Sequence, residues 1–270
     1  MARLVGIWGR PYIGMDDVLD TSALPAIDDE VTRALVDIDP GQTGGGLKHM
    51  GICAPWVNDD PYVDYSDVIE RFTFGEWQQL VALADAPDDF DPSRWQQTRF
   101  GDETDHPLNR RQMRWLTYRY GVYFPWKVCV HLLENDRWED KHHGAGKEFT
   151  EQATALMPTT VAWLKALPFE QMGRVVIFGL MPNDHAPAHR DSEPGRDLTV
   201  AQSLSIDPRG TKEFYLSDPD GEEVDVDSKL YWFNDMDYHG VRSQPVFRYS
   251  IRVDGVYRPA FLRDLQRRPR

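Results

Sequence analysis

The sequence predicts an α+β protein, with a helix-rich first part over residues 1–170 and short antiparallel strands over residues 171–260. Apolar residues recur at helical spacing in the first part. In the second, short apolar or alternating runs are separated by turn sequences such as DPDG at 218–221. Such strands are typical of a small sandwich or barrel, around which the helical part would pack. Because no low-complexity linker interrupts the chain, we expect one domain over residues 1–270, with residues 261–270 as a C-terminal tail.

Three helical regions are expected in the first part. Thr73 and Glu76 form a T-x-x-E capping box ahead of a helix whose apolar face includes Trp77 and Leu80. A second helix is indicated by similar spacing in RRQMRWLTYRY at 110–120. The third region spans about 147–167, and we expect Pro158 to interrupt it.

The second part contains several predicted strands. They are RVVIFGL at 174–180, DLTVAQSLSI at 197–206, the strand within PRGTKEFYLSD at 208–218, KLYWFND at 229–235 and FRYSIRVDGVY at 247–257. In the last strand, one face is apolar and contains Tyr249 and Ile251. The other face contains Arg248, Ser250 and Arg252. If the apolar face packs against helices, the polar face points into the barrel.

Composition and charge narrow the function. The net charge of −14 argues against nucleic acid or an anionic membrane surface as partner, because phosphate binding needs clustered Lys and Arg. We find no signal peptide, and no apolar run of about 18 residues that could span a membrane. Cys53 and Cys129 form no CxxC pair and are interpreted as buried thiols of a cytoplasmic protein.

Titratable residues are concentrated in NDHAPAHRDSEPG at 183–195, directly after a buried strand. On a strand, His189 and Asp191 would face the same side. His239, farther along the chain, could supply a third ligand. Two histidines and one carboxylate are typical of non-haem Fe(II) oxygenases. His185 is a rival ligand, but HAPAH contains a proline and no helix that would align His185 with His189. A solvated loop with surface histidines is the alternative interpretation.

The polar face of the strand at 247–257 could bind an anion. A buried guanidinium needs an anionic partner, and its planar fork suits a carboxylate. Ser250 could donate a second hydrogen bond to the anion that Arg248 binds. The alternative is the ordinary exposed face of an edge strand.

Together, His189-x-Asp191, His239 and Arg248-x-Ser250 resemble, in this order, the Fe(II)/2-oxoglutarate-dependent oxygenases. The resemblance covers about 172–257. It implies a double-stranded β-helix, also called a jelly roll or cupin-like barrel. The run RVVIFGLMPND…AHRD further resembles the aspartyl/asparaginyl β-hydroxylase branch. That branch often lacks the carboxylate ligand, so its substrate is not carried over to this chain.

The resemblance also implies roles. His189, Asp191 and His239 would hold Fe(II), which 2-oxoglutarate would chelate through its C1 carboxylate and keto oxygen. The distal C5 carboxylate would be bound by Arg248 and Ser250. Two further residues are possible contacts to 2-oxoglutarate: Arg252, as second choice after Arg248, and Gln202, near the C1 carboxylate. Gln202 could instead be an ordinary satisfied polar residue. Because halogenases of this superfamily lack the carboxylate ligand, Asp191 favours hydroxylation.

The expected activity is therefore that of a dioxygenase that hydroxylates a C–H bond and releases succinate and CO2. Its partners would be dioxygen and an amino acid, a peptide or a small biosynthetic molecule. Two alternatives stay open from the sequence. One is a cupin-type metalloenzyme that does not use 2-oxoglutarate, and the other is a non-catalytic binding barrel with incidental histidines.

Overall fold

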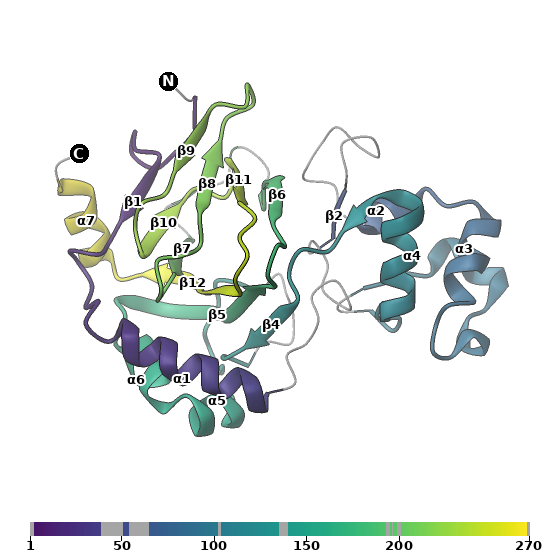
Figure 1. The fold of residues 1–270 in the computed structure, drawn as a ribbon, viewed down its shortest axis with the longest axis horizontal. Coiled ribbons are helices and arrows are strands. Elements are labelled where there is room, and N and C mark those ends of the chain that lie inside the picture. Colours follow the sequence, from purple (N-terminus) through teal and green to yellow (C-terminus); the bar gives the residue numbers. More distant parts are fainter. Residues whose placement is uncertain are drawn as a thin grey trace. The chain divides into compact units, whose positions relative to one another are not determined.

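The structure is a computed structural model, and it describes residues 3–38, 51–53, 65–101, 104–134, 140–192, 195, 197–198 and 201–268. The chain divides into two compact units. The first combines residues 1–40 with 128–270, and the second is formed by residues 41–127 (Figure 1). The units do not divide at residue 170, where the sequence changes character. A single domain over the whole chain stays a prediction.

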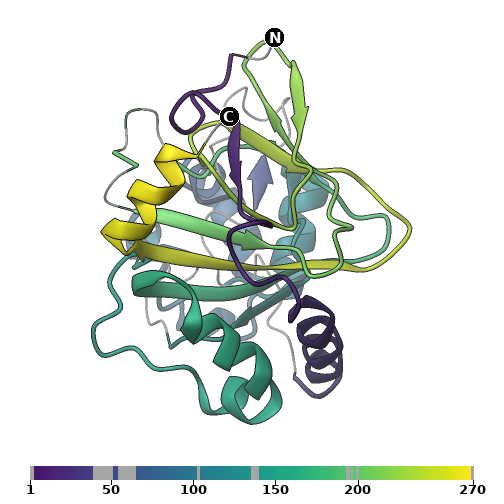
Figure 2. The ribbon, with the colours of Figure 1, turned by 90° about the vertical axis from the view of Figure 1, so that its left-hand side faces the viewer.

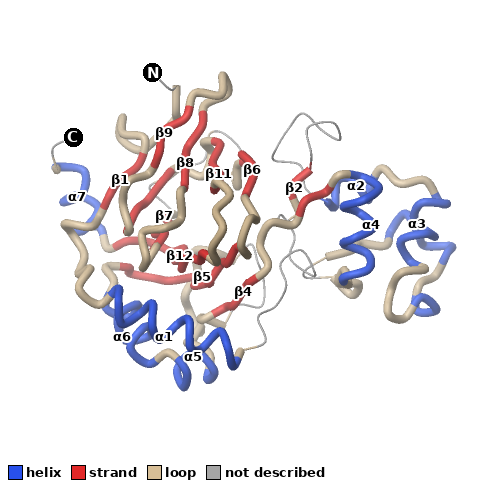
Figure 3. The backbone as a smooth tube through the Cα atoms, viewed as in Figure 1, coloured by secondary structure: helices blue, strands red, loops and turns tan. Residues whose placement is uncertain are grey.

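The first unit is built on two antiparallel sheets (Figure 3). The six-stranded sheet has the order β1-β10-β7-β12-β5-β4, with bounds Tyr12–Gly14, Leu230–Phe233, Gln202–Ile206, Arg248–Tyr257, Phe169–Leu180 and Val128–His131. The four-stranded sheet has the order β6-β11-β8-β9, with bounds Ala186–His189, Tyr238–Val241, Phe214–Ser217 and Glu223–Asp225. The predicted mixture of helices with antiparallel strands is thus confirmed.

The chain passes repeatedly from one sheet to the other. Strands β5, β7, β10 and β12 belong to the six-stranded sheet, whereas β6, β8, β9 and β11 belong to the four-stranded sheet. In the six-stranded sheet, β12 pairs with β5 on one side and with β7 on the other. This places the last strand of the chain at the centre of its sheet, where both of its faces are covered.

The core lies between the six-stranded sheet and a layer of helices, α1 (Leu24–Asp37), α5 (Glu151–Leu156) and α6 (Pro158–Ala166), as Figure 2 shows. Tyr249, Ile251 and Val253 of β12 are buried in this core. The other face of β12 carries four polar residues that are also buried, Arg248, Ser250, Arg252 and Asp254. The apolar face of this strand therefore packs against helices, as predicted, and its polar face points the other way.

Helix α1 is not among the elements expected from the sequence, although Leu24, Ile27 and Val31 recur at helical spacing and are buried. Its Glu30 reaches the start of α6, where the carboxylate accepts hydrogen bonds from the backbone N–H groups of Thr159 and Thr160 at 2.9 and 2.6 Å. The first N–H groups of a helix have no partner within the helix. Glu30 therefore caps α6 from a neighbouring helix.

The expected break at Pro158 is present. Helix α5 ends at Leu156 and α6 begins at Pro158, where a proline at the first helical position removes no internal hydrogen bond.

The second unit contains the two other predicted helices. Its elements are β2 (Ile52–Cys53), α2 (Tyr65–Glu70), α3 (Phe74–Val81), the 3₁₀ turns Pro87–Asp89 and Pro92–Gln97, α4 (Arg110–Tyr120) and β3 (Val122–Tyr123). The predicted capping box is formed, because Thr73 accepts from the N–H of Glu76 and the Glu76 carboxylate accepts from the N–H of Thr73. Gly121 ends α4 with φ of 68°, the left-handed conformation that favours glycine. A separate apolar cluster that includes Trp77, Leu80 and Leu116 holds this unit together.

Two boundaries differ from the sequence prediction. Residues 261–270, expected as a tail, instead contribute most of helix α7 (Pro259–Arg267), whose Leu265 is fully buried. The strand expected over 197–206 is assigned only from Gln202, and residues 199–200 lie outside the described part. None of the described helices is long and apolar enough to cross a membrane, and the cytoplasmic location stays a prediction.

We expect Glu30→Ala to lower the free energy of unfolding by about 0.5–2 kcal/mol, the usual range for losing a helix cap. Burial would raise the pKa of Glu30, but the hydrogen bonds from Thr160 and Thr159 outweigh it and lower the pKa below 4.5. A lowered folded-state pKa means that the stabilisation exists above pH 4.5 and is lost as the pH falls through the folded-state value. Denaturant unfolding at several pH values measures this. Glu30→Gln keeps an acceptor oxygen but has no charge to titrate, so its difference from Ala should not vary with pH.

Candidate metal centre

The two candidate histidines face each other across a pair of strands. His189 is the last residue of β6, and His239 lies in β11, its antiparallel neighbour. They are direct partners in the register, and their ring centroids lie 4.5 Å apart. Both side chains are buried. Sheet pairing alone therefore brings together two residues that are far apart in the sequence.

The glycine after His239 permits this close approach. A Cβ atom at Gly240 would lie 2.7 Å from the backbone oxygen of Ala186 and 2.4 Å from the Tyr215 hydroxyl. Any side chain here would push β6 or β8 away from β11. A glycine in a strand interior often marks such a close backbone contact.

Asp191 reaches the histidines from a turn. The sequence suggested that Asp191 shares a strand face with His189. Strand β6 instead ends at His189, so Asp191 lies beyond it. The backbone oxygen of Asp235, in the turn before β11, instead accepts the N–H groups of Asp191 and Ser192 at 3.0 and 3.2 Å. The Asp191 carboxylate then lies 3.6 Å from Nε2 of His189 and 3.6 Å from Nε2 of His239. One ligand atom from each of the three residues lies within 4.8 Å of the others.

Each histidine is oriented through its other ring nitrogen. Nδ1 of His189 lies 2.7 Å from the Pro187 carbonyl oxygen, and Nδ1 of His239 lies 3.0 Å from that of Asp237. With a proton on each Nδ1, both Nε2 lone pairs face Asp191. Ligating histidines in metal sites are commonly fixed in this way. Burial, followed by His239, lowers the pKa of His189 to about 4. A histidine that stays neutral near pH 7 suits a metal ligand.

The donor set fits a non-haem Fe(II) ion. Two imidazoles and one carboxylate from one side of a site are the ligands that such iron sites use. Burial alone would raise the pKa of Asp191, but His239 and Arg252 outweigh burial and hold it well below its usual value. The third ligand is therefore ionised at neutral pH, as metal binding requires.

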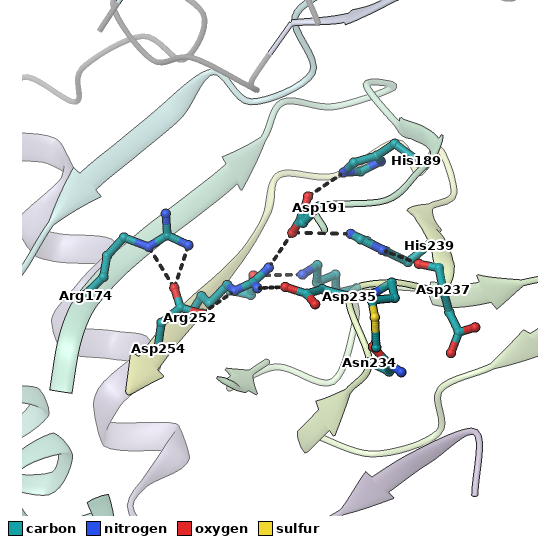
Figure 4. Close-up of polar contacts among 12 residues, drawn as sticks. Arg174, His189, Asp191, Asn234, Asp235, Asp237, His239, Arg252 and Asp254 are labelled. Carbon is teal, nitrogen blue, oxygen red and sulfur yellow. Dashed lines mark hydrogen bonds and ion pairs between the residues drawn. The ribbon is translucent and has the colours of Figure 1, made fainter. Parts of the chain in front are cut away.

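Arg252 links the candidate ligands to a buried ion-pair network (Figure 4). Its Nη1 donates to Asp191 Oδ2 at 2.8 Å and its Nε donates to Asp254 Oδ1 at 2.9 Å. Nη2 lies 3.6 Å from Asp235 Oδ2. On the far side, Arg174 of β5 donates through Nε to the second oxygen of Asp254 at 2.7 Å. Burial raises the pKa of Asp254, but Arg174 and Arg252 outweigh it and hold that pKa far below the usual value.

Three of the four residues predicted to bind 2-oxoglutarate lie on the polar face of β12, and each has a hydrogen-bond partner within the protein. Arg252 is engaged by three carboxylates, as described above. Arg248 is buried and donates to the backbone oxygens of Gln244 and Asp184 at 3.2 and 2.8 Å. Ser250 Oγ accepts from Lys212 Nζ at 2.9 Å.

Gln202 is not brought to this cluster. It lies on the same face of β7 as Leu204 and Ile206, whose side chains belong to the core beside the helices. Its amide donates to the Leu198 oxygen and accepts from the Tyr257 N–H, both at 2.8 Å. Both polar atoms of its side chain therefore have partners within the protein, and a contact to 2-oxoglutarate stays a prediction. His185 is exposed, precedes β6 and is not part of the cluster.

Lys212 is a candidate site residue that was not predicted from the sequence. It is buried, its Nζ lies 5.0 Å from the Phe214 ring centroid, and Phe214 in turn packs 5.7 Å from the His239 ring. Burial lowers its pKa to about 8, partly opposed by Asp207. Lys212 lies two residues before β8 (Phe214–Ser217), so strand parity did not identify it from the sequence.

The N-terminal segment supports the turn that carries Asp235. The Asp237 carboxylate accepts from the N–H groups of Val5 and Gly6 at 2.6 and 2.8 Å. Asn234 donates to the Gly6 oxygen at 3.0 Å. The turn before His239 is thus held from both sides, by residues 191–192 and by the start of the chain.

We expect Asp254→Ala to lower the free energy of unfolding by about 3–5 kcal/mol, because it leaves two buried guanidinium groups without their shared carboxylate. Denaturant unfolding measures the loss. Asp225→Ala is the matched control, because Asp225 is exposed and pairs with Arg242 at the surface. That change should cost no more than about 1 kcal/mol. Equal effects of the two substitutions would contradict a stabilising role for the buried network.

No family model matches the sequence. No curated protein matches it either. Among solved structures, the chain is similar to an oxidoreductase of the 2OG-Fe(II) oxygenase family from Burkholderia pseudomallei, at 10% identity over 48% of this chain and 70% of that chain, with a TM-score of 0.31. It is also similar to a Pseudomonas putida prolyl-4-hydroxylase, at 14% identity over 49% and 73% of the two chains, with a TM-score of 0.28. A third is AviO1 from Streptomyces viridochromogenes Tue57, at 15% identity over 55% and 80%, with a TM-score of 0.30. At these identities and TM-scores, the function must be argued from the residues of the site.

Proposed function

We propose that the protein is an Fe(II)/2-oxoglutarate-dependent oxygenase. The observation that carries the proposal is the buried cluster of His189, Asp191 and His239, with both Nε2 atoms 3.6 Å from the carboxylate. These three residues would hold the iron. Bound iron would activate dioxygen and couple the oxidative decarboxylation of 2-oxoglutarate, to succinate and CO2, with hydroxylation of a substrate C–H bond.

The order of the strands supports this function. Eight successive strands, β5 to β12, are divided between two sheets, and the histidines lie on adjacent strands of the smaller sheet. This is the arrangement expected for the double-stranded β-helix that the motifs imply. The proposed substrate is an amino acid, a peptide or another small biosynthetic molecule, in keeping with the net charge of −14 that disfavours nucleic acid.

The distal carboxylate of 2-oxoglutarate would be bound by Lys212 and Ser250, beside Arg248. Lys212 and Ser250 are already hydrogen-bonded to each other, and both are buried. Arg248 and Arg252 are near enough to Lys212 to lower its pKa further, after the effect of burial. A carboxylate placed among these cations would offset their mutual repulsion. Lys212 thus joins the residues predicted from the sequence as a cosubstrate ligand.

Anaerobic addition of Fe(II) and 2-oxoglutarate should produce a weak visible charge-transfer band in the wild-type protein and none in His189→Ala. With a screen of amino acids and small peptides, wild type should form succinate. Native mass spectrometry after Fe(II) loading provides the second readout. Metal binding without any effect of 2-oxoglutarate would indicate the cupin-type alternative. Equal metal content in wild type and His189→Ala would indicate a binding barrel, and the oxygenase proposal would then be abandoned.

Lys212→Met should weaken 2-oxoglutarate binding by about tenfold or more, which corresponds to the loss of one charge-assisted hydrogen bond of roughly 1.5–3 kcal/mol. Because the pKa of Lys212 is about 8, wild-type affinity should decline as the pH rises through that value and the ammonium loses its proton. Lys212→Arg should remove this decline, since guanidinium stays charged. Isothermal titration of the metal-loaded protein measures both effects. Lys229→Met, an exposed lysine 17 positions later, is the control. An unchanged affinity in Lys212→Met would exclude the lysine from this role.

A further inference from the structure

The two carboxylate oxygens of Asp191 lie in different surroundings. Oδ2 accepts a hydrogen bond from Arg252 Nη1 at 2.8 Å. Each oxygen also lies 3.6 Å from the Nε2 atom of one histidine, Oδ1 from His189 and Oδ2 from His239, so the bond to Arg252 is what distinguishes them. A charge-assisted bond to guanidinium satisfies one lone pair of Oδ2 and draws charge away from it. The two oxygens are therefore not equivalent as metal ligands, and Oδ1 is the better one.

Arg252 cannot readily follow the carboxylate if Asp191 moves. Its Nε is bonded to Asp254, and its Nη2 faces Asp235 at 3.6 Å. Asp254 is in turn fixed by Arg174 at 2.7 Å, and Figure 4 shows these side chains in one continuous series from Arg174 to Asp191. The backbone of β12 is paired on both sides. The guanidinium is thus a fixed donor, and its position is set by Asp254, Asp235 and the paired backbone of β12.

We propose that Arg252 is a positioning residue that keeps Asp191 a one-oxygen ligand, by holding Oδ2 so that Oδ1 alone binds the metal. This inference rests on the proposed function and deepens it. Carboxylates can bind metal ions through one oxygen or through both. With one oxygen from Asp191, the three ligands leave three positions of an octahedral ion open. With both oxygens, two would remain.

The number of open positions decides whether the proposed reaction is possible. A 2-oxo acid that chelates through its carboxylate and keto oxygen occupies two positions, and dioxygen needs one more. An Asp191 that bound through both oxygens would compete with one of them. Arg252 would therefore set the capacity of the site rather than its affinity for the metal.

The test counts the water molecules on Mn(II), used as a spectroscopic probe for the divalent ion. Their number follows from the broadening of the Mn(II) electron paramagnetic resonance lines in ¹⁷O-enriched water. Wild type should carry three waters, and Arg252→Gln should carry two while still binding Mn(II). The affinity of the Mn(II)-loaded protein for 2-oxoglutarate should fall by about tenfold or more in Arg252→Gln. A merely structural role would lower the melting temperature without changing the water count.

Two further variants complete the design. Arg252→Lys can still donate one hydrogen bond to Oδ2, although it lacks the planar fork, so it should restore three waters. Arg242→Gln is the matched control, because Arg242 also binds two carboxylates, Glu223 and Asp225, but does so at the surface. Its water count and its affinity for 2-oxoglutarate should equal those of wild type.

If Arg252→Gln does not fold, the charge-matched double variant Arg252→Gln/Asp235→Asn replaces it. That variant removes one cation and one anion and leaves the Arg174–Asp254 pair in place. Three waters and an undiminished affinity for 2-oxoglutarate in either variant would overturn the inference. Failure of the proposed function looks different, since wild type itself would then bind no 2-oxoglutarate or would bind Mn(II) independently of His189.

Discussion

The structure of the first unit depends on the two-faced character of strand β12. Successive side chains of a strand point to opposite sides, and here the two sides have opposite chemistry. Tyr249, Ile251 and Val253 are buried beside the helices, whereas Arg252 and Asp254 are buried on the other side. A shift in register by one residue would place charges in the apolar core, at a cost of several kcal/mol per unpaired ion. The same alternation therefore fixes the sheet and orients the site.

Much of the candidate metal site could be predicted because its residues are close in the sequence or lie on adjacent strands. The order His189-x-Asp191 and then His239 was sufficient to group the three residues. The route by which Asp191 arrives was not predictable, since it depends on a backbone hydrogen bond to Asp235 across a turn. The helix cap at Thr73 and the break at Pro158 followed from local rules that involve only neighbouring residues.

Other features depend on contacts between distant residues. Lys212 is linked to the polar face of β12 by the hydrogen bond from its ammonium group to Ser250, 38 positions later. Arg174 and Asp254 are register partners on the adjacent strands β5 and β12, and neither shows its partner in the sequence. The placement of Gln202 could have been predicted from the alternation of side chains along its strand, because Leu204 and Ile206 share its face and belong to the apolar core. The division into two units was not visible, since residues 1–40 join a unit that resumes at residue 128.

The hydrogen bonds of the N-terminal segment have a consequence for the order in which the chain can fold. Val5 and Gly6 bind Asp237, more than 230 residues away along the chain. During synthesis, Val5 and Gly6 are made long before Asp237, so their hydrogen bonds to its carboxylate cannot form until β10 and the following turn have been made. Contacts of such long range are slow to form, because the entropy of closing a large loop opposes them until late. The turn before His239 would therefore become ordered near the end of folding, and the metal ligands would come together after the helices have formed.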